Sequence, residues 1–347
     1  MSNVLYIDLL KSRYFTLLSG NPSELENLIE NQTTIIIDEI QKVPQLLDEV
    51  HRLIETKKYR FLLTGSSARK LKKGHANLLA GRAWTLNLFP LTFSELSRFD
   101  LKRALRFGLL PVVWLSQDPE EELDAYISTY LKEEIMAEGL SRNLPAFNRF
   151  LKVAALSSGS LINYSKMASD TQVAESTLRG HFEILQDTLM GIIIEPFIES
   201  KKRKAITTPK FYIFDNGVRH ALMGTTALDR NSDLYGSSFE AFIAHEMRAY
   251  LSYSRSKLPL TFWRSTSQFE VDFLIGDKVA IEVKAASHAH DGYLRGLSAL
   301  SDENIFRDFY LITQDPITRT GNLKSGQKVK FIPWDQFLKR LWKGEIF

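Results

Sequence analysis

An apolar run near the start of the chain ends abruptly in two adjacent carboxylates. The run is Thr33–Ile37, and Asp38 and Glu39 follow it. A short, β-branched run between polar residues predicts a strand buried on both faces, as in the centre of a parallel sheet. Open α/β sheets bind ligands at the carboxyl ends of their strands, where an Asp can hold Mg²⁺ while a neighbouring Glu orients water. The alternative is that the carboxylate only caps the next helix.

A second apolar run, Tyr59–Leu63, follows a segment, 46–54, whose apolar residues recur at helical spacing. Strand, helix and strand in this order predict a right-handed crossover between parallel neighbours. That connection brings the residues after the second strand, Thr64 and Ser66, beside Asp38. A hydroxyl in this position can contact a γ-phosphate.

The middle of the chain predicts helices followed by a hairpin. Leu86–Pro90 predicts a short strand stopped by proline, and the pattern is helical from about 101 to 140. Apolar residues at three- and four-residue steps predict three helices between about 145 and 189, in an order typical of a winged helix. Two apolar strands then flank the basic tetrad Lys201–Lys204. At a hairpin tip this tetrad would contact a phosphate backbone, or it is a charged, exposed turn that protects the sheet edge.

Two segments of alternating apolar residues lie close together in the last third of the chain. They are Phe269–Ile275 and Lys278–Lys284, and Gly276–Asp277 is a candidate two-residue turn between them. This arrangement predicts an antiparallel hairpin. Because side chains alternate along a strand, Asp272 can share one face with Glu282 on the other strand.

The polar side chains of this hairpin form a chemically specific set. Glu282 and Lys284 are two residues apart and point the same way, toward the face that carries Asp272. Carboxylate oxygens suit Mg²⁺, and a nearby lysine offsets negative charge when a phosphodiester is attacked. Glu240, in an apolar helix upstream, is a candidate further ligand. The alternative is that the E-x-K pair is an ordinary exposed charge pair.

Composition sets broad limits on the class of protein. The length of 347 residues predicts two or three domains, and 44% hydrophobic residues allow a sizeable core. The net charge of +3 does not by itself indicate nucleic acid. The sequence contains no cysteine, which excludes disulfides, thiolate zinc sites and cysteine nucleophiles. It shows neither a secretory leader nor a membrane-length apolar run, so we expect a soluble cytoplasmic protein.

The first part of the chain, to about residue 100, resembles the AAA+ type ATPases of bacteria and archaea, which carry a C-terminal domain of unassigned function. Three segments carry the resemblance: IIIDEIQKVP, FLLTGSSARKL and LLAGRAWTLNLFPLTFSEL. The resemblance implies ATP and Mg²⁺ as ligands, with Asp38 at the metal in the Walker B motif and Glu39 orienting water. It also implies Thr64 or Ser66 as the sensor hydroxyl. Arg82 would be an arginine finger, acting in its own chain or on a neighbour in a homo-oligomer.

One element of that family is missing from the sequence. The Gly-rich G-x-x-x-x-G-K-[ST] loop, whose backbone N–H groups and lysine hold the phosphates, does not occur in it. The opening strand at Val4–Asp8 is similar to the family's second strand. We therefore expect an N-terminally truncated copy or a fragment, with weak or absent ATP hydrolysis.

The tail resembles the restriction-endonuclease-like domain at the C-terminus of the same ATPases. Asp272, nine residues, Glu282, one residue and Lys284 is the spacing of the PD-(D/E)xK nuclease core. The resemblance implies that the carboxylates hold Mg²⁺ and that DNA is a partner. Members with this fold use it for cleavage or for binding alone.

The predicted fold class is α/β, in four parts. These are a truncated AAA+ nucleotide-binding core at 1–100, a helical lid at 101–144, a winged-helix-like domain at 145–232 and a nuclease-like domain at 233–347. The predicted function is that of a DNA-associated, ATP-binding protein with a nuclease-like tail. The alternative is a non-catalytic nucleic-acid or protein binding module derived from that family.

Overall fold

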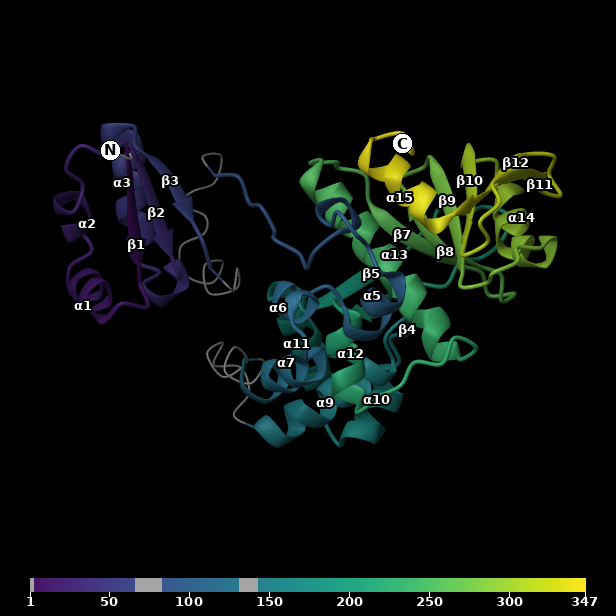
Figure 1. Cartoon of the computed structure of the whole chain (residues 1–347), viewed down its shortest axis with the longest axis horizontal. Coiled ribbons are helices and arrows are strands. Elements are labelled where there is room, and N and C mark those ends of the chain that lie inside the picture. Colours follow the sequence, from purple (N-terminus) through teal and green to yellow (C-terminus); the bar gives the residue numbers. More distant parts are fainter. Residues whose placement is uncertain (1–2, 66–82, 131–142) are drawn as a thin grey trace. The chain divides into compact units, whose positions relative to one another are not determined.

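The computed structural model describes residues 3–65, 83–130 and 143–347. The chain divides into two compact units, of which the second comprises Leu86–Lys132 and Arg142–Phe347. Figure 1 shows the course of the chain through each. The predicted site residues Ser66 and Arg82 lie outside the described residues.

The first unit is a three-stranded parallel sheet with helices against one face. The strand order β1-β2-β3 places the strand that ends in Asp38 at the centre. The predicted crossover is present, because α3 connects two parallel neighbours. The elements are β1 (Val4–Asp8), α1 (Ser12–Gly20), α2 (Glu24–Asn27), β2 (Thr34–Asp38), the 3₁₀ turn η1 (Ile40–Lys42), α3 (Leu46–Lys57) and β3 (Arg60–Leu63).

The central strand β2 was predicted to be buried on both faces, and within this unit that prediction is wrong. Ile35 and Ile37 are fully buried in the core with α1, α2 and α3. Ile36 points the other way and is only half-buried. Its cross-strand neighbours Tyr6 and Leu62 are 50% and 51% exposed. A continuous β-branched run is compatible with burial on two faces, but the helices α1, α2 and α3 cover only one.

The second unit is built on a nine-stranded mixed sheet in the order β11-β12-β10-β9-β8-β7-β5-β6-β4 (Figure 1). Strands β4, β5 and β6 pair antiparallel, as do β7, β8 and β9, and β10 lies parallel to β9 and β12. A short parallel pairing of β5 with β7 joins the two parts. The strands are β4 (Ser160–Leu161), β5 (Gly191–Pro196), β6 (Lys210–Ile213), β7 (Leu260–Arg264), β8 (Glu270–Ile275), β9 (Val279–Lys284), β10 (Asp308–Thr313), β11 (Arg319–Asn322) and β12 (Lys328–Pro333).

Helices fill the connections between these strands. The three helices predicted between about 145 and 189 are present as α9, α10 and α11, and the predicted basic hairpin follows as β5 and β6. The helical elements are η3 (Phe93–Glu95), α5 (Leu101–Phe107), α6 (Pro111–Leu115), α7 (Pro119–Ala125), η4 (Tyr126–Tyr130), α9 (Leu144–Leu156), α10 (Tyr164–Thr171), α11 (Glu175–Asp187), α12 (Asn216–Met223), α13 (Asp233–Tyr253), η5 (Asp291–Leu294), α14 (Arg295–Ser301) and α15 (Trp334–Trp342).

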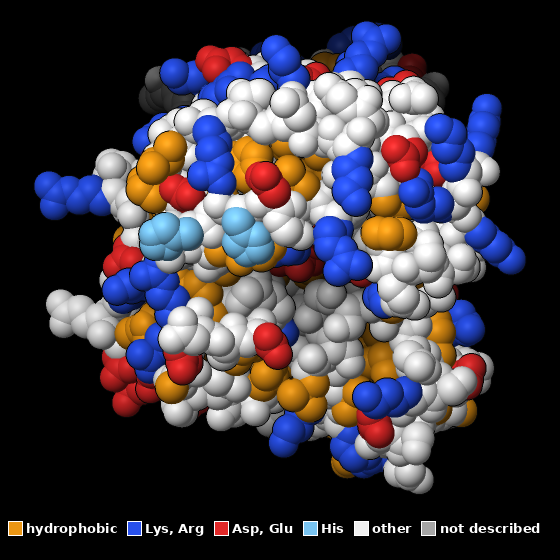
Figure 2. All heavy atoms as spheres, turned by 90° about the vertical axis from the view of Figure 1, so that its right-hand side faces the viewer, with side chains coloured by type: hydrophobic (Ala, Val, Ile, Leu, Met, Phe, Trp, Pro, Cys, Tyr) orange, Lys and Arg blue, Asp and Glu red, His pale blue; other side chains and the backbone are white. Residues whose placement is uncertain are grey.

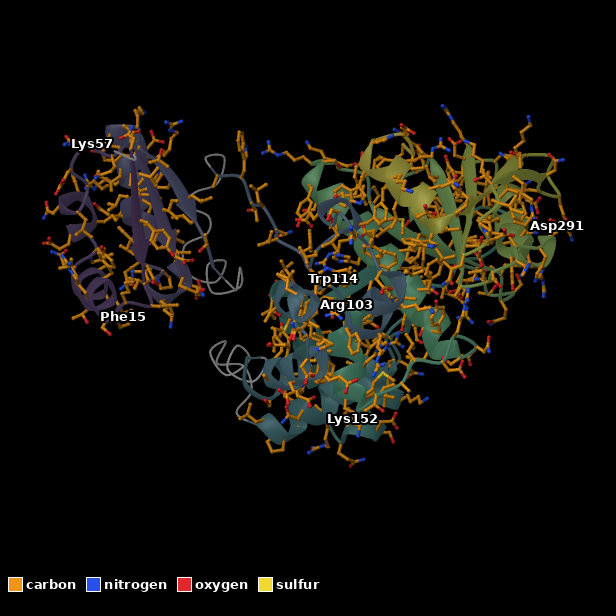
Figure 3. The ribbon with its side chains drawn as sticks, viewed as in Figure 1. Phe15, Lys57, Arg103, Trp114, Lys152 and Asp291 are labelled. Carbon is orange, nitrogen blue, oxygen red and sulfur yellow. The ribbon has the colours of Figure 1, made fainter. Side chains whose placement is uncertain are left out.

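Arg103 holds the short helices α5 and α6 together (Figure 3). Its guanidinium donates to the carbonyl oxygens of Val113, Trp114 and Ser116 at 3.1, 3.1 and 2.8 Å. It also lies 5.7 Å from the centre of the Trp114 ring. The last carbonyls of a helix have no partner within it, so this side chain caps the end of α6.

Helix α13 forms the centre of the second unit's core. Its buried Glu246 accepts a hydrogen bond from the backbone N–H of Phe93 at 2.7 Å and another from Trp342 Nε1 at 2.7 Å. The carboxylate therefore ties the segment before α5 and the last helix, α15, to α13. His245 contacts the Leu91 carbonyl oxygen through Nε2 at 3.1 Å, which adds a second tie.

Two local predictions are corrected by the structure. Leu86–Pro90 forms no strand, because it packs against side chains of α13: the Phe89 N–H donates to the Tyr253 hydroxyl at 3.1 Å. The turn of the β8–β9 hairpin has three residues, 276–278, because Ile275 pairs directly with Val279. Gly276 begins that turn at a φ of 55°, a left-handed conformation that favours glycine.

No helix in the part of the chain that the structure describes has both the length and the apolar character needed to cross a membrane.

Glu246 should make the unfolding free energy of the second unit fall as the pH rises. Burial raises the pKa of Glu246 to about 7 from an ordinary 4.5, so between these pH values the folded state holds a proton that the unfolded state releases. The expected loss is about 3 kcal/mol from pH 4.5 to pH 7. Glu246→Gln should remove the contribution of Glu246 to this slope in guanidinium unfolding followed by tryptophan fluorescence, while the buried Glu240 and Glu282 keep theirs. Glu345→Gln, at an exposed glutamate, serves as the control, and an unchanged slope in Glu246→Gln would contradict the prediction.

Candidate functional site

Polar side chains meet at the carboxyl ends of the strands in the first unit. The Tyr6 hydroxyl donates to Asp38 Oδ2 at 2.6 Å, and the Thr64 hydroxyl donates to Asp38 Oδ1. These bonds, first that of Thr64 and then that of Tyr6, lower the pKa of Asp38 below its ordinary value. The carboxylate is therefore ionised at neutral pH and held by two hydroxyl groups.

The neighbouring Glu39 has an unusual backbone. Its φ of 61° lies in the left-handed region, and its carboxylate accepts a hydrogen bond from Gln41 Nε2 at 2.5 Å. The next backbone N–H, of Ile40, donates to the Thr64 carbonyl oxygen at 3.0 Å. The structure thus brings Asp38, Glu39 and Thr64 together at one end of the sheet.

A second cluster lies in the second unit, on β8 and β9. Asp272 and Glu282 are 5% and 6% exposed. Asp272 directly precedes Phe273 and Glu282 directly follows Ile281, and these two residues pair across the antiparallel strands, so the two carboxylate side chains share one face. Lys284 lies between them, with its ammonium 3.4 Å from Asp272 Oδ2 and 2.6 Å from Glu282 Oε1. All three residues that the spacing singled out are therefore in contact.

Burial dominates the electrostatics of this cluster. It raises the pKa of Glu282 to about 8, and the negative charge of Asp272 acts in the same direction. Burial opposes the charge on Lys284, but the carboxylates of Asp272 and Glu282 outweigh it and raise the pKa of its ammonium above the usual range. Glu282 Oε2 is buried and has no hydrogen-bond partner. A buried oxygen without a partner is costly unless a cation or another donor reaches it.

Glu240 belongs to an adjoining group of charges. Lys210 Nζ lies 2.5 Å from Glu270 Oε1 and 3.4 Å from Glu240 Oε1, and the Tyr212 hydroxyl donates to the same Glu240 oxygen at 2.5 Å. Burial is the main cause that raises the pKa of Glu240, and the charge of Asp272 adds to it. Arg264 lies 3.3 Å from the other oxygen of Glu270, Oε2. Lys210 and Tyr212, both on β6, thus hold Glu240 next to the hairpin cluster.

Sequence reasoning missed four residues of the two sites. Glu270 could have been found, because it lies two residues before Asp272 on the same strand and shares its face. Tyr6, Lys210 and Tyr212 carry no such signal. They lie on other strands, so only the register of the sheets reveals them.

Among the residues that the structure describes, no three His, Asp or Glu side chains are arranged to hold a metal ion by themselves. The two carboxylates of the hairpin cluster are paired with Lys284 instead of a third acid. Their oxygens are nevertheless of the kind that Mg²⁺ prefers, and Mg²⁺ is usually held by one or two carboxylates together with water and phosphate.

The backbone of the basic tetrad is bound to the tail, whereas the side chains of Lys201, Lys202 and Lys204 are exposed. The backbone N–H groups of Lys201, Lys202 and Arg203 all donate to the Glu303 carboxylate, at 2.7, 2.9 and 3.1 Å. Arg203 also pairs with Asp302 at 2.9 Å.

On the face that carries β10 to β12, Figure 2 shows basic side chains interspersed with acidic ones and an indentation across the middle.

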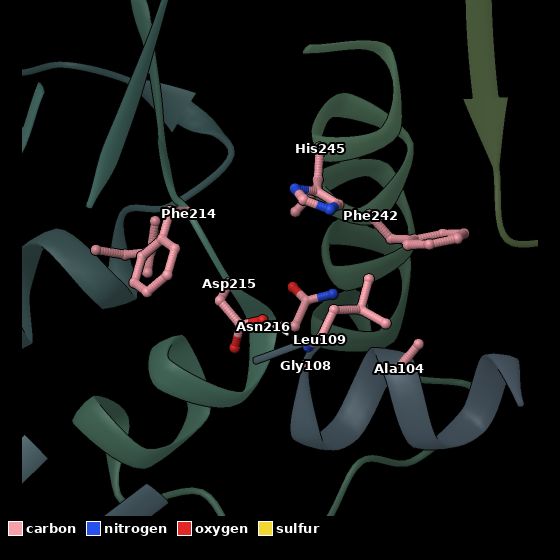
Figure 4. A pocket seen from close by; sticks show the side chains of 10 residues that line it. Ala104, Gly108, Leu109, Phe214, Asp215, Asn216, Phe242 and His245 are labelled. Atoms are coloured by element: carbon pink, nitrogen blue, oxygen red, sulfur yellow. Dashed lines mark hydrogen bonds between the residues drawn. The ribbon is translucent and has the colours of Figure 1, made fainter. Parts of the chain in front are cut away.

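A separate small pocket lies between α5, α12 and α13 (Figure 4). Asp215 begins α12 beside it and accepts hydrogen bonds from the Leu109 and Val218 backbone N–H groups at 2.7 and 3.1 Å. Asn216 donates to the Ser238 carbonyl oxygen at 2.9 Å, and its Oδ1 is buried without a partner. Asp215 thus joins the α5 segment to α12.

Comparison with known proteins assigns three consecutive parts of the chain. Residues 1–97 match the family model described as an AAA domain. Residues 98–229 match a domain of unknown function, DUF8612, and residues 235–337 match another, DUF4143. These matches support an AAA-like ATPase-family protein. For the AAA-type part, the match suggests nucleotide use with Mg²⁺ in general.

The relatives that the comparison found are uncharacterized proteins. One from Mycobacterium tuberculosis is 28% identical over 264 residues, which is 73% of this chain and 59% of the relative. One from Methanocaldococcus jannaschii is 23% identical over 301 residues, or 78% of this chain and 65% of the relative. The chain thus spans about three fifths of the length of these relatives. No solved structure matches the chain.

The charged cluster of the second unit draws on two of the matched parts. Lys210 and Tyr212 lie in residues 98–229, whereas Glu240, Asp272 and Glu282 lie in residues 235–337. The geometry therefore requires both parts to be folded against each other.

Replacing Thr64 by valine should raise the pKa of Asp38 toward its ordinary value, because the Thr64 hydroxyl is the larger of the two causes that lower it. Tyr6→Phe should raise it less. The pKa is read from the pH dependence of the carboxyl ¹³C chemical shift. Thr56→Val is the matched control, since that hydroxyl bonds to the Arg52 carbonyl oxygen on α3. An Asp38 pKa that is the same in Thr64→Val and the parent would refute this account.

Proposed function

We propose that this chain is the nucleotide-associated part of a DNA-processing protein whose tail carries an Mg²⁺-dependent, nuclease-like site. The observation that carries the proposal is the pair Asp272 and Glu282: two buried carboxylates on neighbouring strands, with Lys284 between them. The partnerless oxygen of Glu282 supports it, because a divalent cation is a natural partner for a buried carboxylate oxygen.

In this proposal Asp272 and Glu282 hold the metal, which would polarise the phosphodiester and activate water. Binding of the cation requires the Lys284 ammonium to leave its place between the two carboxylates. Its side chain is 34% exposed, so it has room to turn toward a bound phosphate and offset the charge that develops there. Glu240 lies beside the pair and is the candidate further ligand.

The cluster in the first unit supports a nucleotide role for the AAA-type part. Asp38 would hold Mg²⁺, Glu39 would orient water, and Thr64 would be the sensor hydroxyl, since it is bonded to the metal-holding carboxylate. We propose that residues 1–347 alone hydrolyse ATP weakly or not at all. No G-x-x-x-x-G-K-[ST] segment, which would hold the phosphates, occurs among them.

A second candidate is a binding module without cleavage, formed by the winged-helix-like order α9, β4, α10, α11, β5 and β6. The exposed face of α11, which would enter a groove, carries Glu175 and Glu183 as well as Arg179. Phosphate contacts would therefore depend on the exposed side chains of Lys201 and Lys204. A partner protein with basic residues suits the α11 face better than DNA does.

The tail site should nick or cleave plasmid DNA in the presence of Mg²⁺ or Mn²⁺. Asp272→Asn and Glu282→Gln keep the shape of the side chains but remove the anionic ligands. Each should slow cleavage about a hundredfold or more, because the charge stabilisation supplied by the metal is lost. The measurement is the rate of loss of supercoiled plasmid on an agarose gel.

Asp308→Asn is the matched control for these variants. Asp308 lies at the start of β10 and pairs with Lys330 at 3.5 Å, and the Asp308 and Lys330 side chains are 46% and 43% exposed. Its cleavage rate should equal that of the parent. If the parent does not cleave DNA but retains it in a salt-dependent manner, the binding module replaces the nuclease in this proposal.

ATP hydrolysis by the chain should not exceed the background rate, and Glu39→Gln should leave it unchanged. The coupled-enzyme assay for released ADP is the measurement. Turnover above background that disappears in Glu39→Gln would show that the Asp38 cluster works as a complete ATPase site and would overturn this part of the proposal.

A further inference from the structure

Two lysines of the second unit occupy equivalent positions, each between a pair of carboxylates. Lys284 lies between Asp272 and Glu282 on the hairpin. Lys210 lies between Glu240 on α13 and Glu270 on β8, at 3.4 and 2.5 Å. The two groups adjoin, because Asp272 lies two residues after Glu270 on the same face of β8 and its charge acts on both Glu240 and Lys210.

The two lysines differ in their freedom to move. The side chain of Lys284 is 34% exposed, whereas that of Lys210 is 4% exposed. Lys210 begins β6, and β6 is fixed by antiparallel pairing with both β4 and β5. The Lys210 ammonium also lies 5.3 Å from the centre of the Phe262 ring. Lys210 is therefore built into the site, whereas Lys284 is able to withdraw from it.

The position of Lys210 is one that a metal ion could otherwise take. Enzymes that hydrolyse phosphodiesters with two metal ions hold them about 3.5–4 Å apart, on carboxylates that the ions share. Glu240 and Glu270 would be ligands of this kind beside the Asp272–Glu282 pair. Here a fixed ammonium neutralises part of their charge and contacts one oxygen of each, Oε1 in both cases.

We propose that Lys210 takes the place of a second metal ion, so that the tail site holds one divalent cation, on Asp272 and Glu282. Lys210 is thus a positioning residue: it keeps Glu240 and Glu270 in place and prevents a second cation from binding between them. This inference rests on the proposed function, because it presupposes a metal at the hairpin cluster. The residue comes from the part of the chain that matches DUF8612, so the middle segment determines the metal content of the tail.

The test is the number of Mn²⁺ ions that the full chain binds, measured by isothermal titration calorimetry, together with the electron paramagnetic resonance spectrum of the bound ions. Each count is taken relative to Asp272→Asn, so that ions bound elsewhere cancel. The parent should bind one ion, with an uncoupled spectrum. Lys210→Met, which removes the charge but keeps a long side chain, should bind two, with the exchange-coupled spectrum of neighbouring Mn²⁺ ions.

Two further variants separate charge from simple loss of packing. Lys210→Arg keeps the positive charge and should bind one ion. The double variant Lys210→Met/Glu270→Gln removes the cation and one carboxylate, so it has the same net charge as the parent but lacks the second ligand. It should also bind one ion. If Lys210→Met does not fold, as judged by circular dichroism, Lys210→Gln replaces it, because its amide keeps hydrogen-bond donors beside the carboxylates.

Two exchange-coupled ions in the parent would overturn the inference while leaving the proposed metal site standing. One ion in folded Lys210→Met or Lys210→Gln would overturn it as well. A parent that binds no more Mn²⁺ than Asp272→Asn would refute the proposed function, and the inference with it.

Discussion

The parallel pairing of β5 with β7 is the constraint on which the second unit depends. It consists of two residue pairs, Glu195 with Thr261 and Pro196 with Phe262, and it is extended by the Phe197 N–H bonded to the Phe262 carbonyl oxygen at 2.7 Å. Without it, the three strands β4 to β6 and the six strands of the tail would be separate sheets. With it, β6 lies in the same sheet as β8 and β9, and Lys210 on β6 contacts the carboxylates of Glu240 and Glu270.

The two carboxylate clusters are controlled by opposite physical effects. Asp38 is held in its ionised form by two hydroxyl donors at the carboxyl end of the central strand of a small sheet, so its negative charge is available near neutral pH. Glu240 and Glu282 are buried near another negative charge, which favours their protonated forms. In the proposed tail site a cation would therefore displace protons as well as the Lys284 ammonium, whereas a cation at Asp38 would displace no proton.

The helices and the side-chain contacts that depend on local periodicity could be predicted from the sequence. The meeting of Asp272, Glu282 and Lys284 follows from alternation along two adjacent strands, and α9 to α11 follow from the spacing of apolar residues. Lys210 and Tyr6 could not be predicted, because their contacts depend on which strands become neighbours across long stretches of chain. The half-exposed Ile36 illustrates the same limit, since apolar character does not reveal how many layers cover a strand. The segment at Leu86–Pro90 was predicted as a strand, but its partners are side chains of α13.

The backbone N–H groups of Lys201–Arg203 are bonded to the Glu303 carboxylate, and this contact affects how the chain folds during synthesis. The turn between β5 and β6 receives its acceptor from a residue about a hundred positions later in the chain, and Lys210 likewise depends on Glu240 and Glu270. During synthesis the middle segment therefore emerges well before these partners do. Its helices form early from local contacts, but its turn and its buried lysine are completed only when the tail has left the ribosome.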